Sequence, residues 1–146
     1  MPSFNDAIAQ LVSILQNDAG LSTFCTDKWG KAHTVGKRFR RRSEINATEY
    51  PLIFITRPDV KKAYRLSGGQ ENENTVRLYC GFQQDDREKV LDEVVEFEEK
   101  INDVLCANQR LNETAKEVHP EDSVNDEALY HPSYFIVMDV RIVHRR

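Results

Sequence analysis

The segment Leu52-Ile53-Phe54-Ile55 places four apolar residues in a row, and it constrains the fold more than any other feature. Tyr50-Pro51 precedes it and Thr56 follows it. Successive side chains of a strand point to opposite faces, so a strand here has two apolar faces. Such a strand needs cover on both sides and belongs inside a sheet. Pro51 fits only at its beginning, because proline cannot donate to a strand ladder.

The hydrophobic periodicity of the remaining sequence predicts helices and further strands. Apolar residues at helical spacing indicate an amphipathic helix, and strict alternation indicates a half-buried strand. Ser3 is a plausible N-cap, with Asp6 completing a near capping box. The predicted elements are a helix from Ser3 to Asp18, a helical turn from Ser22, a loop over 30–49 with a strand around 34–41, strands at 50–56, 60–66 and 75–82, a helix from Asp85 or Asp86 to about Asn108, a short strand near 115–119 within an irregular segment 109–133, and a last strand at 134–143.

This order predicts one α+β domain spanning residues 1–146. Strands 60–66 and 75–82 form a hairpin, with residues 67–74 as the connection. We expect a mainly antiparallel or mixed sheet of about four to five strands, with two main helices packed on it.

Charge is unevenly distributed along the chain. Residues 28–65 hold 11 basic and 3 acidic residues, so that this segment carries +8 and the remainder −12. Residues 85–103 hold nine acids against three bases, and residues 111–128 hold six acids against one base. Such a chain can attract a second copy of itself or a partner of opposite polarity.

The basic run Lys37, Arg38, Arg40, Arg41 and Arg42 is the candidate partner-binding loop. Clustered like charges cost energy unless counter-charges lie near. The loop is either a solvated segment, or a contact for an acidic protein surface, or a contact for nucleic-acid phosphate. A general nucleic-acid binder usually has a wholly basic domain, whereas this chain has net charge −4, so nucleic acid is the secondary partner.

Asp92, Glu96 and Glu99 lie opposite the apolar stripe of the main helix. A solvated helix face explains these carboxylates. They are also a candidate acidic docking face for a partner.

No pattern in the sequence indicates catalysis, a metal or a cofactor. His33, His119, His131 and His144 lack ligand spacing, and scattered surface histidines explain them. Cys25, Cys80 and Cys106 form no C-x-x-C pair, so we expect reduced thiols, at least two of them in the core. We predict no enzyme activity.

The sequence also predicts no membrane contact. The longest apolar runs are 52–55 and 134–138, whereas a spanning helix needs about 20 apolar residues. The N-terminus lacks a signal-peptide pattern, so we expect a cytoplasmic protein.

The order and lengths of these elements resemble the phage tail terminator proteins, and among them the minor tail proteins encoded in prophages. The resemblance is carried by the opening helix, the long loop, the strand Tyr50 to Ile55, the hairpin, the acidic helix and the final strand. The acidic segment 109–133 is longer than the family pattern requires.

The resemblance implies a structural subunit without catalytic residues, in a ring that is usually hexameric. This ring would cap the tail tube and join it to the head connector, so the partners would be copies of itself and other tail or connector proteins. The protein would be made in the bacterial cytoplasm and reside in the virion tail, with Lys37, Arg38, Arg40, Arg41 and Arg42 facing the lumen or the tube. The alternative is a small nucleic-acid-binding module that uses the loop 37–42.

Overall fold

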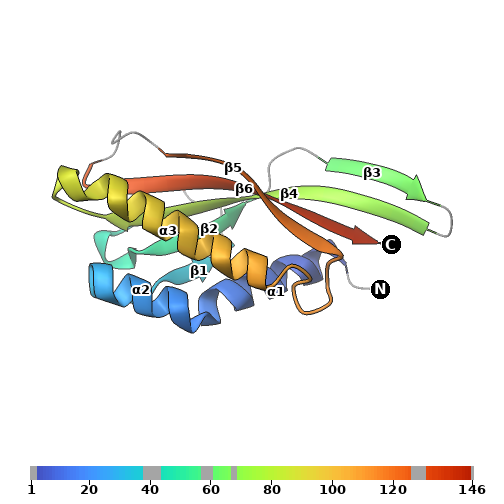
Figure 1. Ribbon diagram of the computed structural model, residues 1–146, viewed down its shortest axis with the longest axis horizontal. Helices are drawn as coiled ribbons and strands as arrows, with labels where there is room; N and C mark the ends of the chain where they lie inside the picture. The colour runs from blue at the N-terminus through green and yellow to red at the C-terminus, as the bar shows by residue number, and fades with distance from the viewer. Residues whose placement is uncertain (1–2, 38–43, 57–60, 67–68, 126–130, 146) are drawn as a thin grey trace.

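The computed structural model describes residues 3–37, 44–56, 61–66, 69–125 and 131–145. Its order of helices and strands confirms the predicted α+β class (Figure 1). The described part contains helices α1 (Phe4–Asn17), α2 (Ala19–Trp29) and α3 (Arg87–Ala107), a 3-10 turn η2 (Ala47–Glu49), and strands β1 (Thr34–Gly36), β2 (Leu52–Thr56), β3 (Lys61–Leu66), β4 (Gly69–Gln83), β5 (Glu117–Asn125) and β6 (Ser133–Arg145).

These strands form one mixed sheet in the order β1-β2-β4-β6-β5, and β3 pairs with β4 beside this path. Only the β1–β2 pair is parallel. Strands β4 and β6 form the longest ladder, which runs from Glu71 opposite Arg145 to Gln83 opposite Ser133. The described sheet has six strands, against the four to five predicted, because β1 and β5 both join it as edge strands.

Local capping sets the limits of the first two helices. The Asp6 N–H donates to Ser3 Oγ at 3.2 Å and the Ser3 N–H donates to the Asp6 carboxylate at 2.7 Å, which confirms the capping box. Asp18 ends α1 and accepts from the Leu21 N–H at 2.8 Å, so it caps α2. The helical turn predicted from Ser22 is therefore a full helix that begins at Ala19. Gly30, at φ 76°, ends it.

Two polar segments that we assigned to loops are strands. Residues 70–74 extend β4 instead of forming the hairpin connection, because β6 pairs with Glu71 to Asn74. Residues 117–125 form β5, which was predicted as mostly irregular. It pairs with β6 and buries Val118, while most of its other side chains stay wholly or partly exposed, so apolar alternation is nearly absent from its sequence.

The three helices lie on one side of the sheet, and the main core fills the space between them (Figure 1). As predicted, Val76, Leu78, Cys80 and Phe82 share the buried face of β4. Trp29 stacks on Phe82 with ring centroids 4.8 Å apart and meets Phe97 edge-on at 5.0 Å. Buried core residues from the helices are Leu11, Leu15, Leu21, Phe24, Val94, Phe97, Ile101 and Leu105.

The opposite face of the sheet carries a second, smaller apolar cluster. It consists of Tyr50, Leu52, Phe54 and Phe135, with Tyr79 stacked on Phe54 at 4.8 Å. Strand β2 therefore has cover on both faces, as its sequence predicted: Ile53 and Ile55 enter the main core, and Leu52 and Phe54 enter the second cluster.

Phe97→Ala should lower the free energy of unfolding by about 3–5 kcal/mol, because the ring is fully buried against Phe82 and Trp29. Urea denaturation measures the change. Val95→Ala, at an exposed position of the same helix, is the control and should change stability by less than about 0.5 kcal/mol. Equal effects of the two substitutions would contradict the assigned helix orientation.

Gly81→Ala should also destabilise the fold. A Cβ atom at this position would lie 2.7 Å from Phe135 Cε1 and 3.0 Å from Tyr50 Cε1. Crowding of this kind typically costs about 1–3 kcal/mol. Gly36→Ala is the matched control, since its Cβ meets nothing within 4 Å. Thermal unfolding of both variants tests whether Gly81 makes room for the aromatic cluster.

Candidate assembly surface

The predicted basic loop begins at the β1 edge of the sheet. Lys37 is exposed directly after β1, whereas Arg38, Arg40, Arg41 and Arg42 lie outside the described residues. The described edge before Lys37 is closed by helix α1. The Gln16 amide donates to His33 O at 3.1 Å and accepts from the Val35 N–H at 2.7 Å, so it takes the place of a neighbouring strand.

The candidate acidic face on α3 is reduced by one internal ion pair. Asp92 and Glu99 are exposed. Glu96 instead bonds Lys28 of α2, with Nζ and Oε2 3.0 Å apart, and this hydrogen bond raises the pKa of Lys28. Of the three predicted docking carboxylates, Asp92 and Glu99 are therefore the two that stay exposed on α3.

One of the nine acids in residues 85–103 is buried, which the sequence analysis missed. Glu93 is only 6% exposed. Its carboxylate accepts from Trp29 Nε1 at 3.1 Å and from Gln84 Nε2 at 2.8 Å. It thereby holds the end of α2 and the β4–α3 connection together. In the sequence, the one indication of this burial was the position of Glu93 between the acidic face and the apolar stripe of the helix.

The surface interpretation of the histidines is wrong for two of the four. His33 is buried, and its Nε2 contacts Leu15 O at 2.5 Å at the last turn of α1. His144 is buried as well and stacks on Phe4 at 5.8 Å. His119 pairs with Glu117 and His131 contacts the Tyr134 hydroxyl. The burial of Cys25 and Cys80, which raises the pKa of Cys25 to about 12, confirms two thiols in the core.

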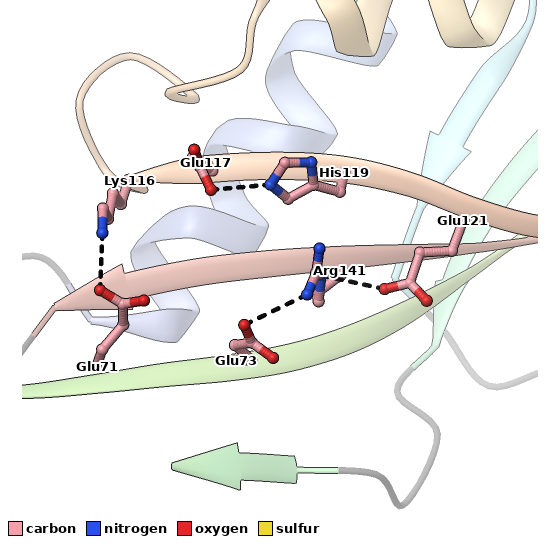
Figure 2. A network of polar contacts seen from close by, with 7 residues as sticks. All are labelled: Glu71, Glu73, Lys116, Glu117, His119, Glu121 and Arg141. Atoms are coloured by element: carbon pink, nitrogen blue, oxygen red, sulfur yellow. Dashed lines mark hydrogen bonds and ion pairs between the residues drawn. The ribbon is translucent and has the colours of Figure 1, made fainter. Parts of the chain in front are cut away.

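Beyond the aromatic cluster, the sheet face without helices carries a network of charged side chains (Figure 2). Arg141 of β6 lies between Glu73 of β4, at 3.3 Å, and Glu121 of β5, at 3.2 Å. Lys116 Nζ lies 2.8 Å from the Glu71 carboxylate. These contacts join β4, β5 and β6 across the sheet.

The same face holds two further polar pairs. His119 Nε2 lies 2.9 Å from Glu117, and this hydrogen bond lowers the pKa of Glu117. Arg77 and Asp139, opposite each other on β4 and β6, form a bidentate pair at 2.8 and 3.3 Å. The sheet face without helices is thus polar over most of its length and apolar only at the aromatic cluster.

A hollow of about 620 Å³ opens at one end of the sheet, between η2 and the ends of β4 and α2. Its two lysines are already occupied, since Lys28 pairs with Glu96 and Lys31 donates to Thr48 O. The hollow therefore offers a ligand no unengaged lysine. Its lining comprises Lys28, Trp29, Lys31, Ala47, Thr48, Tyr50, Pro51, Gln83, Gln84, Asp85 and Pro132.

Within the described ranges, no three His, Cys, Asp or Glu side chains are grouped so that they could hold a metal ion. Among the described helices, none is both long and apolar enough to cross a membrane. The absence of enzyme activity stays a prediction.

Comparison with known proteins finds similarity in structure but none in sequence. No protein-family model and no curated protein matches the sequence. A chain in the structure named "Virion of native gene transfer agent (GTA) particle" is similar, with a TM-score of 0.63 and 9% sequence identity. The alignment covers 94% of this chain and 93% of that chain. The two proteins therefore share a fold over nearly their whole lengths.

Glu93→Leu should destabilise the protein by about 1–3 kcal/mol, because it leaves the Trp29 and Gln84 donors without their acceptor. Glu93→Gln, which keeps one acceptor oxygen, should cost less. Asp92→Leu makes the same change at an exposed position and should fall within about 0.5 kcal/mol of wild type. Chemical denaturation compares the three, and a neutral Glu93→Leu would show that these bonds contribute nothing.

Proposed function

We propose that this protein is a structural subunit of a phage-type virion. The observation that carries the proposal is the fold shared along 94% of the chain with a component of a gene transfer agent virion. Because the match extends over 94% of this chain and 93% of that chain, the support comes from nearly the entire domain and not from a fragment of it.

We further propose the tail-terminator role: a ring of identical subunits that caps the tail tube and contacts the head connector. The distribution of charge supports this finer proposal. A ring requires heterologous contacts, in which one surface of the protein binds a different surface of the next copy. The chain has opposite charges in its segment 28–65 and on helix α3, where Asp92 and Glu99 are exposed.

The proposed partners of the basic loop are carboxylates on another subunit or on another tail protein. Lys37 supports this, because it is exposed directly after β1. We propose that the protein has no catalytic role. We also propose that it is made in the host cytoplasm and resides in the virion tail after assembly.

Replacing Arg40, Arg41 and Arg42 together by Ala tests the loop. Stability of the monomer should change little, since exposed charges contribute little to it. Self-association, measured by light scattering across a concentration series, should weaken. Wild-type association should also weaken as salt rises, because screening acts over about 8 Å at physiological ionic strength. Replacing Lys89 and Lys100 by Ala removes exposed cations elsewhere and serves as the control.

The alternative, a nucleic-acid-binding module, predicts a different outcome for the same variant. Retention on DNA or RNA would collapse and lose its salt dependence, while the oligomeric mass would stay unchanged. That result would overturn the tail-terminator role of the loop. A wild-type protein that stays monomeric at every concentration would count against ring formation itself.

A further inference from the structure

The described sheet has three edges, of which one is closed to strand addition and one is only partly open to it. The β1 edge is occupied by the Gln16 amide, as described above. The β5 edge is interrupted: Pro120 has no N–H, and the register with β6 shifts between Pro120 and Ser123. Proline, bulges and charges are the usual means by which proteins limit pairing at an edge.

Strand β3 is different. It pairs with β4 from Lys61 opposite Asn74 to Leu66 opposite Gly69, and among the described elements β4 is its strand partner. Figure 1 shows β3 at the far end of the sheet from α2, beyond the region that the helices cover. Its outer edge therefore presents main-chain groups to which a further strand can bond.

The charges of β3 define what that strand can be. Its sequence KKAYRL carries three cations and no acid. Antiparallel pairing of β3 with the β3 of a second copy would bring like charges opposite each other, which is unfavourable. An acidic strand is favoured instead, and β5, with Glu117, Glu121 and Asp122, is acidic and free of Lys and Arg.

We infer that the outer edge of β3 in one copy lies along the β5 edge of the next copy, so that the sheet continues from subunit to subunit. This inference rests on the ring proposed above and assigns two of its contacting surfaces. The contact is heterologous, because β3 and β5 are different edges of the same sheet, and repetition of such a contact generates a ring or a filament.

Both kinds of interaction contribute to this contact. The interruption at Pro120 limits the number of main-chain bonds that β5 can make, so the bonds alone do not select the partner. Exposed Glu117 and Asp122 then provide the selectivity through the cations of β3. The same charges disfavour β3–β3 and β5–β5 pairing.

Ala63 offers a selective test of the edge. Leu66 and Gly69 flank a connection of two residues, and hydrogen-bonded and non-hydrogen-bonded pairs alternate along an antiparallel hairpin. Counting back from Leu66, the Ala63–Asn72 pair is a non-hydrogen-bonded one, so the Ala63 N–H points away from β4. Ala63→Pro then removes an outward donor and leaves the β3–β4 ladder intact.

The experiment measures association of the full chain by light scattering or sedimentation over a concentration series. Ala63→Pro should weaken association about tenfold or more, as expected for loss of roughly 1.4 kcal/mol. Ala63→Ser keeps the N–H and is the matched control. The thermal unfolding midpoint at a concentration where the protein is monomeric confirms that each variant is folded.

A charge exchange provides a second arm that does not depend on the proline variant. Lys61→Glu with Arg65→Glu should weaken association, and so should Glu117→Lys with Asp122→Lys. The β3 positions lie opposite neutral Asn74 and Gln70, so their reversal creates no repulsion across the hairpin. Each double variant alone pairs a reversed edge with a wild-type edge of the same charge. An equimolar mixture of the two can alternate reversed β3 on reversed β5 with wild-type β3 on wild-type β5, so it should associate. Combining all four changes in one chain also restores opposite charges and should restore association.

The outcomes separate the inference from the function on which it rests. Association that survives both Ala63→Pro and the charge reversals overturns the β3–β5 contact and leaves the ring in place. Failure of the fourfold variant to regain association, although it is folded, overturns the charge pairing between the two edges. A wild-type chain that never associates overturns the ring and this contact together.

Discussion

The antiparallel ladder between β4 and β6 is the interaction on which the remaining structure depends. It joins the two longest strands along their shared length, although the sequence separates them by helix α3 and strand β5. One side of this ladder presents Val76, Leu78, Ile136 and Val140 to the helices. Strands β2 and β3 pair with β4, and β5 pairs with β6. The β4–β6 pair therefore sets the positions of these three strands in the sheet.

Different interactions stabilise the two faces of the ladder. On the helix side, burial of apolar side chains provides the main driving force. On the open side, the aromatic cluster covers only one end, and charged pairs such as Arg77–Asp139 take over along the remainder. These pairs are partly exposed and contribute modestly to stability. They leave a hydrated surface that can select a partner by charge.

The separation of charge along the chain becomes a separation in space. Strand β3 carries three cations and Lys37 is exposed directly after β1, whereas acids gather on α3 and β5. Such an arrangement favours contact between unlike surfaces over contact between identical ones, because like charges repel each other. This property connects the fold shared with a virion component to the proposed ring.

Local sequence determined the elements whose causes lie within a few residues. The capping box of Ser3 and Asp6, the apolar stripe of α3 and the alternation of β4 and β6 needed no distant partner to be recognised. Tertiary structure alone decided the burial of His33 and Glu93, because their partners Leu15 and Trp29 are distant in sequence. It also decided the pairing of β5 with β6, because the sequence of β5 lacks apolar alternation. A polar residue is buried only where a specific partner satisfies it, and periodicity carries no information about that partner. The outer edge of β3 could not be predicted from the sequence either, because an edge is defined by the order of the strands in the folded sheet.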